Sequence, residues 1–196
     1  KIFAGIYTPT QGKIIIPADA GIGTMIELGV GFHPELTGRE NIFLAASIYG
    51  LCRTEIEEIY PSVVEFSEIE GFIDTPIKNY SSGMQARLGF ALAVDLDPDI
   101  LLVDEVLAVG DEAFQRKCEE QIDRFRSQGK TIIFVSHSPD AVKKICDRAC
   151  LLDNGTLLFV GSADEAIQRY HALLGEANGI SLVKSSIQRD ALSNIS

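Results

Sequence analysis

Two short, continuously apolar segments that both end in polar residues constrain the fold most strongly. Residues 99–105 read DILLVDE and residues 130–137 read KTIIFVSH. An uninterrupted run of Leu, Ile and Val is typical of a parallel strand that is buried on both faces. Between the two segments, residues 112–128 fit one helix that ends at Gly129. This strand–helix–strand order predicts an α/β fold with right-handed crossovers.

The first third of the chain combines weak strand patterns with a strong helical one. Residues 1–12 read as the end of a helix that enters a turn, which suggests a chain cut from a longer one. Residues 13–16 and 24–28 are apolar enough for short strands. Residues 35–78 contain no clear strand pattern and are predicted to form an inserted helical subdomain.

Capping signatures predict where the helices of this subdomain begin. Thr37 is followed three residues later by Glu40, and Thr54 by Glu57, which is the spacing of a capping box. Pro61 lies inside the second helical pattern and predicts a kink or a break there.

Start and turn signals also divide the C-terminal third. Ser138 precedes a helix, and the Asn154-Gly155 pair predicts a hairpin between two strands. Ser162 is expected to cap a last helix. From about residue 175 the periodicity fades, so residues 175–196 read as a linker or as the start of a C-terminal extension.

Composition limits the partners. The net charge of the 196 residues is −11, and a strongly acidic chain repels phosphate backbones, so we expect no nucleic-acid partner. No apolar run approaches the roughly eighteen residues of a membrane span. The four cysteines form no C-x-x-C pair, which favours reduced thiols in a cytosolic protein over a zinc site.

The polar residues at the two strand ends are the first candidate site. Ligands of open α/β sheets bind beyond the carboxyl ends of the strands, where Asp104 and Glu105 follow one strand and His137 the other. The side chains of adjacent residues point in different directions. One carboxylate could therefore lie near a Mg²⁺ ion, and the other over an attacking water. His137 could contact a γ-phosphate. The alternative is that these carboxylates end a strand and face water.

The second candidate site is the start of a helix. Ser81, Ser82 and Gly83 precede a helical pattern, and the free N–H groups of a helix N-terminus bind anions. Gly83 would let the backbone approach such a ligand closely. Ser82 with Gln85 also fits a capping box, and the residues alone favour this purely structural interpretation.

These motifs, in this order over residues 1–174, resemble the ATP-binding cassette of ABC transporters. YSSGM is similar to the signature motif L-S-G-G-Q and keeps its Ser81 and Gly83. ILLVDE is similar to the Walker B strand, Asp111 lies where the D-loop lies, and His137 lies where the switch histidine lies. ELGVGFHPELTGRENIF and DEVLAVGDEAFQRKC resemble the subfamily that exports lipid-linked polysaccharides such as O-antigen or teichoic acid.

The resemblance implies a P-loop NTPase-like parallel sheet with a helical subdomain, over about residues 35–97, in an N-terminally truncated ABC ATPase. ATP and Mg²⁺ are the implied cofactors. Glu105 would act as general base, Asp104 would help hold Mg²⁺, and His137 would contact the γ-phosphate.

The implied partners are a second copy of the chain and a transmembrane permease subunit. Ser81, Ser82, Gly83 and Asp111 would contact the nucleotide held by the second copy in a head-to-tail dimer. The permease would be reached through residues 35–78, with the chain peripheral at the cytoplasmic face of the inner membrane.

The sequence departs from the family pattern in two places. The phosphate loop G-x-x-x-x-G-K-[ST] is absent, through truncation or through true loss. The Q-loop region reads MIELGVGFHP and has no glutamine, so that Glu27 stands near the metal-sensing position. Two alternatives stay open: a soluble ABC-type ATPase that transports nothing, and a non-hydrolysing interaction module.

Overall fold

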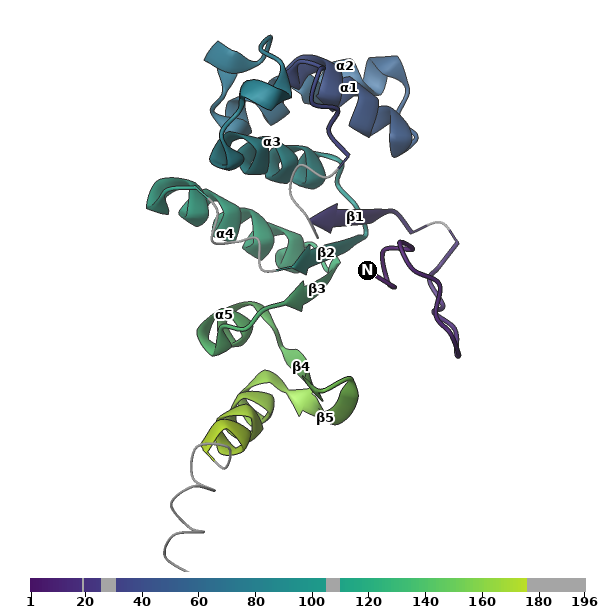
Figure 1. Ribbon diagram of the computed structural model, residues 1–196, viewed down its shortest axis with the longest axis vertical. Coiled ribbons are helices and arrows are strands. Elements are labelled where there is room, and N and C mark those ends of the chain that lie inside the picture. Colours follow the sequence, from purple (N-terminus) through teal and green to yellow (C-terminus); the bar gives the residue numbers. More distant parts are fainter. Residues whose placement is uncertain (19, 26–30, 105–109, 176–196) are drawn as a thin grey trace, which may run out of the picture. The chain divides into compact units, whose positions relative to one another are not determined.

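The computed structural model describes residues 1–18, 20–25, 31–104 and 110–175 (Figure 1). These residues divide into two compact units, one ending at Val135 and one beginning at Ser136. The predicted helical subdomain belongs to the first unit, and the predicted hairpin belongs to the second.

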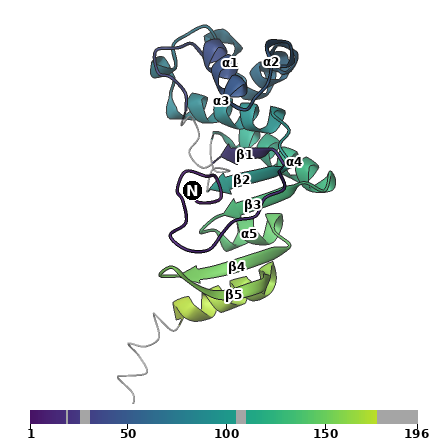
Figure 2. The same cartoon turned by 90° about the vertical axis from the view of Figure 1, so that its right-hand side faces the viewer.

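A three-stranded parallel sheet forms the centre of the first unit. Its strands are β1 (Ile22–Met25), β2 (Ile100–Asp104) and β3 (Thr131–Val135), and they lie in this order across the sheet (Figure 2). The middle strand is buried, as its apolar run predicts, with Leu101, Leu102 and Val103 inside. The predicted α/β architecture is confirmed.

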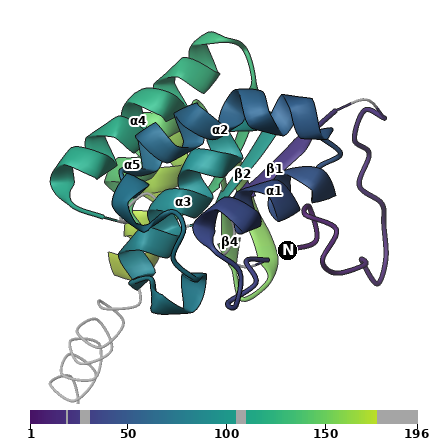
Figure 3. The ribbon, with the colours of Figure 1, turned by 90° about the horizontal axis from the view of Figure 1, so that it is seen from above.

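Helices α1 (Gly38–Ile48), α2 (Arg53–Ser67) and α3 (Ser82–Asp95) form the helical part of the first unit, with the short 3-10 turns η1 (Glu70–Phe72) and η2 (Ile77–Asn79). Helix α3 packs against both α2 and β1 (Figures 1 and 3). The helices enclose a continuous apolar cluster: Ile42, Ala46, Ile56, Val63, Val64, Ile69, Ile73, Ile77, Tyr80, Leu88, Ala91 and Leu92.

The predicted start of α1 is confirmed. The Thr37 hydroxyl accepts a hydrogen bond from the Glu40 amide at 3.2 Å, and the Glu40 carboxylate accepts one from the Thr37 amide at 2.8 Å. These two bonds close the capping box and set where the helical part begins.

The predicted start of α2 is wrong by two residues. Cys52 is the cap, and its amide donates to the Glu55 carboxylate at 2.6 Å. Glu57 instead pairs with Arg53 on the helix surface, 2.9 Å away. The predicted break at Pro61 is also wrong, because α2 continues through it. Proline removes one helical hydrogen bond, and burial of Val63 and Val64 beyond it keeps the last turn in place.

Two expectations near the N-terminus are not met. Residues 13–16 form no strand, and no described strand pairs with them. A strand needs a partner for its backbone groups, and Ile15 is 78% exposed. The expected helix end over residues 1–12 is a hydrogen-bonded turn, in which the Gly5 amide donates to the Ile2 carbonyl at 3.0 Å.

Helix α4 (Glu112–Ser127) connects β2 to β3 and packs against β3. Phe114, Cys118, Ile122 and Phe125 are its buried face, and burial raises the pKa of the Cys118 thiol to about 12. Gly129 follows the helix at φ +75°, a conformation that glycine adopts without a steric penalty. The helix predicted over residues 112–128 is confirmed.

The second unit contains α5 (Pro139–Ile145), the antiparallel strands β4 (Arg148–Asp153) and β5 (Thr156–Ser162), and a helix over residues 163–175. Asn154 and Gly155 both have positive φ, at 46° and 79°, as the predicted hairpin turn requires. The Ser162 hydroxyl accepts from the Glu165 amide at 3.3 Å, as expected.

Apart from Gly175, the linker expected over residues 175–196 lies outside the described residues. Among the helices that the structure describes, none is long and apolar enough to cross a membrane.

Candidate functional site

The start of α3 is built on Ser81. Its hydroxyl accepts from the Met84 amide at 3.2 Å, which makes Ser81 the cap and Ser82 the first helical residue. The capping box expected from Ser82 and Gln85 is therefore wrong: the Gln85 side chain donates to the Ile77 carbonyl, 3.4 Å away. The residue before the cap is also fixed, because the Tyr80 hydroxyl donates to the Phe72 carbonyl at 2.8 Å.

This helix N-terminus keeps free donors. The amides of Ser82 and Gly83 have no hydrogen-bonding partner within the described part of the chain. Unpaired amides in the first turn carry the positive end of the helix dipole and can bind an anion. A Cβ atom added at Gly83 would meet only the Ser81 hydroxyl, at 3.8 Å. Packing among the described residues therefore gives no reason for glycine at this position.

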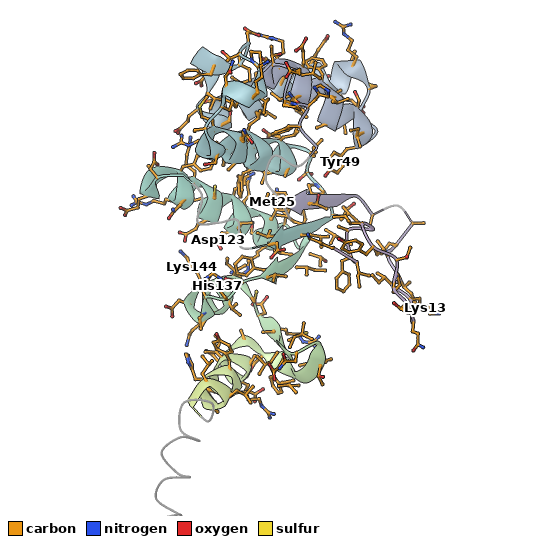
Figure 4. All side chains as sticks on the ribbon, viewed as in Figure 1. Lys13, Met25, Tyr49, Asp123, His137 and Lys144 are labelled. Carbon is orange, nitrogen blue, oxygen red and sulfur yellow. The ribbon has the colours of Figure 1, made fainter. Side chains whose placement is uncertain are left out.

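The strand ends are only partly described. Asp104 is the last residue of β2 and stands beside Val135 of β3 in the parallel register. Glu105 and Glu27, the expected general base and the expected metal-sensing residue, lie outside the described residues. His137 belongs to the second unit, just before α5, where it is labelled in Figure 4. Next to it, the Ser136 hydroxyl accepts from the Ser138 amide at 3.0 Å and shapes the chain before α5.

Asp111 makes two contacts inside its own chain. One carboxylate oxygen accepts from the Phe114 amide at 2.9 Å and caps α4, and the other lies 2.7 Å from Arg87 of α3. The hydrogen bond from Phe114, with the nearby charge of Arg87, lowers the pKa of the Asp111 carboxyl. Asp111 is thus ionised at neutral pH, and both of its carboxylate oxygens are held by contacts within its own chain.

Arg87 is a residue that the sequence patterns did not single out. It pairs with Glu68 as well as with Asp111, and these partners are 19 and 24 residues away in the chain. Periodicity cannot reveal such long-range pairs. One feature of the sequence could have pointed to Arg87. It follows Gly83 by four residues, which places both on one face of α3.

The described residues contain no group of three or more side chains that could together hold a metal ion. That does not conflict with the expected Mg²⁺, which takes one or two protein carboxylates and fills its remaining positions with water and substrate phosphates. Asp104, at the carboxyl end of β2, is the described residue whose chemistry and place fit this ligand.

Comparison with known proteins identifies the family. Residues 1–108 match the family model described as ABC transporter. The chain belongs to the ABC transporter family.

Two curated relatives of the chain are export ATP-binding proteins. The chain is 50% identical over 169 residues to an O-antigen export system ATP-binding protein, RfbB, of Klebsiella pneumoniae, covering 86% of this chain and 68% of that protein. It is 46% identical over 170 residues to the teichoic acids export ATP-binding protein TagH of Listeria monocytogenes, covering 87% of this chain and 50% of TagH. The chain thus spans between half and about two thirds of the length of these two relatives.

Solved structures share the fold. An ATP-binding subunit of an ABC transporter superposes with a TM-score of 0.68 at 25% identity, over 78% of this chain and 63% of that one. A dimeric ATP-binding cassette, MJ0796, bound to ADP and phosphate, superposes with a TM-score of 0.61 at 21% identity, over 74% and 63%. The resemblance to an ABC ATPase that the sequence motifs carry is confirmed.

Proposed function

We propose that this chain is part of the ATP-hydrolysing subunit of an ABC transporter that exports lipid-linked polysaccharide across the inner membrane. The observation that carries the proposal is the 50% identity, over 86% of the chain, to an O-antigen export ATP-binding protein. The similarity to a teichoic acids export protein supports the same class of cargo. Residues 1–174 would belong to the nucleotide-binding domain, and residues 175–196 would form a linker or the start of a C-terminal extension.

In this proposal the start of α3 acts on a nucleotide bound by a second copy of the chain. The unpaired amides of Ser82 and Gly83, with the Ser81 hydroxyl, would face the γ-phosphate across a head-to-tail dimer. The space at Gly83 supports this role, because a side chain there would obstruct a ligand from outside but would make no close contact with the residues that the structure describes.

The other half of the reaction would be performed at the strand ends. Glu105 would orient and deprotonate the attacking water, Asp104 would help hold Mg²⁺, and His137 would contact the γ-phosphate. When bound, Mg²⁺ neutralises charge that develops on the phosphates. Glu27 would stand near the metal in place of the usual glutamine.

The permease subunit would bind the helical part of the first unit, at the cytoplasmic face of the membrane. The end of α1 supports this assignment: Leu44, Ile48 and Tyr49 are large apolar side chains left exposed there, with Ile48 at 73%. Exposed apolar side chains that gather on one element are typical of a protein–protein contact.

A Glu105→Gln substitution in the intact gene tests the proposal. ATP hydrolysis should fall by about 10²–10⁴-fold, the usual effect of removing a general base, while ATP binding persists. In the cell, surface polysaccharide should disappear and the lipid-linked polymer should accumulate inside. The matched control is Glu120→Gln, which removes an exposed carboxylate from α4.

Two outcomes would contradict the proposal. Normal surface polysaccharide despite lost hydrolysis would indicate an ATPase that serves another process. An intact protein that binds no ATP would indicate an interaction module.

A further inference from the structure

Arg87 lies at the centre of a charged cluster that joins three helices. Its side chain is only 16% exposed, and its guanidinium nitrogens lie 2.7 Å from Glu68 and 2.7 Å from Asp111. Glu68 ends α2 and Asp111 begins α4, whereas Arg87 itself is in the middle of α3. One side chain therefore ties the end of one helix to the start of another.

Aromatic rings reinforce this connection. The Arg87 guanidinium carbon lies 4.7 Å from the centre of the Phe114 ring, and Lys117 lies 5.4 Å from the centre of the Phe66 ring. The Lys117 ammonium also pairs with Glu68 at 2.6 Å. A largely buried guanidinium that is held by two carboxylates and a ring has little freedom to move, because each contact fixes a different side of the planar group.

The cluster has a specific place relative to the proposed site. Gly83 and Arg87 are four residues apart on α3, so both lie on one face, one turn from each other. Asp111 follows Glu105 by six residues in the sequence and caps α4. Helices α3 and α4 lie next to each other in Figure 1. Arg87 thus connects the face of α3 that carries Gly83 with the N-terminus of α4.

We infer that Arg87 is a positioning residue for ATP hydrolysis, which fixes the start of α4 against the Gly83 face of α3 through Asp111. The inference rests on the proposed function, because hydrolysis is one of its two readouts. Arg87 contacts neither nucleotide nor water in this role. It sets the distance between the N-terminus of α3 and the N-terminus of α4.

A different role for the same cluster is charge compensation. Glu68 and Asp111 would repel a phosphate near α3 if they were unpaired, and Arg87 and Lys117 balance them one for one. Compensation and positioning predict different results when Arg87 and Glu68 are both neutralised.

The first measurement uses the full-length protein without nucleotide. Hydrogen exchange is followed at the amides of Phe114 and Gln115, which both bond to Asp111. Arg87→Gln should speed their exchange by about tenfold, the scale of losing one charge-assisted hydrogen bond. Arg39→Gln is the matched control: Arg39 also pairs with a carboxylate, Asp74 at 2.8 Å, and lies over a ring, yet it does not contact α4.

The second measurement is steady-state hydrolysis by the same proteins. Arg87→Gln should lower kcat by about tenfold and leave KM for ATP within about twofold, since the nucleotide contacts are untouched. The double variant Arg87→Gln/Glu68→Gln removes one charge of each sign, which keeps the cluster balanced, and it leaves Asp111 and its cap of α4 unchanged. Its kcat should equal that of Arg87→Gln alone.

The outcomes separate the explanations. Wild-type kcat in the double variant would show charge compensation and overturn the inference, as would unchanged exchange in Arg87→Gln. An equal loss of kcat in Arg39→Gln would show general destabilisation and overturn it too. If the wild-type protein does not hydrolyse ATP, the proposed function fails by itself, and the exchange measurement alone decides whether Arg87 holds α4.

Discussion

At the residue scale, Asp95 is a carboxylate in an unfavourable place. One of its oxygens is buried with no hydrogen-bonding partner in the described part of the chain. Burial raises the pKa of Asp95, and a hydrogen bond with Ser62 offsets this only in part. Asp95 is also the last residue of α3, where the negative end of the helix dipole opposes its charge.

We expect Asp95→Asn to stabilise the fold at neutral pH. A raised pKa means that the folded state binds the proton more tightly, so the free energy of unfolding falls as pH rises from about 3.9, the unfolded value, through the folded one. The variant should therefore gain about 1 kcal/mol at pH 7 and lose this advantage below about pH 4. Denaturant titrations at several pH values measure it. Glu58→Gln, an exposed carboxylate on α2, is the control and should show no such trend.

Asn41 is also a buried polar residue, but both ends of its side-chain amide are hydrogen-bonded. It is 0% exposed, accepts from the His33 amide at 2.6 Å, and donates to the carbonyls of His33, Leu36 and Thr37. Asn41→Leu has similar volume but leaves the His33 amide without its acceptor, whereas the carbonyls of His33, Leu36 and Thr37 keep their backbone donors. The free energy of unfolding should fall by about 1–3 kcal/mol. A loss below about 0.5 kcal/mol would mean that water replaces the amide, as happens at surface positions.

At the scale of the element, α3 allows its structural and functional roles to be separated. Gly83→Asp adds a carboxylate where the space is open and where the helix dipole favours negative charge, by about 0.3–1 kcal/mol. The variant should therefore fold with undiminished stability and bind ATP as a monomer. It should fail to form the ATP-dependent dimer, because the carboxylate repels the incoming γ-phosphate.

Size-exclusion chromatography with ATP, in the Glu105→Gln background, measures the dimer. Gly71→Asp is the matched control, since Gly71 lies in η1 with open space around it. If Gly83→Asp dimerises as well as this control, YSSGM is a helix cap and nothing more.

The elements differ in how well the sequence predicts them, and the reason is the range of the interactions that fix each one. The central strand, α4 and the Asn154-Gly155 hairpin are fixed by local pattern, and all three are confirmed. Residues 13–16 have an apolar pattern but no described partner strand, and a strand depends on its neighbour. Arg87 is fixed by partners far along the chain, which no local rule detects.

The range of the interactions also explains how much of the candidate site the sequence predicts. The helix start at Ser81 follows from small residues before an apolar pattern, although the structure moves the cap from Ser82 to Ser81. Whether Ser81 and Gly83 serve a ligand cannot be read from local pattern, because capping and anion binding use the same residue types. That no described residue distant in the chain packs against Gly83 is information that only the tertiary structure gives.

At the scale of the whole molecule, the polypeptide 1–196 should not hydrolyse ATP. No segment of it has the loop pattern whose amides and lysine hold the β- and γ-phosphates. Phosphate release by purified 1–196 should therefore equal that of its Glu105→Gln variant. A rate clearly above this control would mean that residues 1–196 complete a phosphate site on their own.

The head-to-tail assembly itself is tested by mixing two defective full-length subunits. One carries Gly83→Asp, and the other carries a substitution in the phosphate loop of the intact protein. Neither homodimer should hydrolyse ATP, because each of its two composite sites contains one defect. In the mixed dimer both defects fall in a single site, so the other site is intact. Partial hydrolysis should thus appear in the mixture and rise with the fraction of mixed dimers.

A second experiment mixes Gly83→Asp subunits with Glu105→Gln subunits. Hydrolysis in that mixture would show that the start of α3 in one subunit works together with the general base of the other. An inactive loop-variant mixture, in which mixed dimers are demonstrably present, would show that the two sites cannot work singly or that YSSGM acts within its own subunit. Activity in the Gly83→Asp homodimer would exclude the trans role altogether.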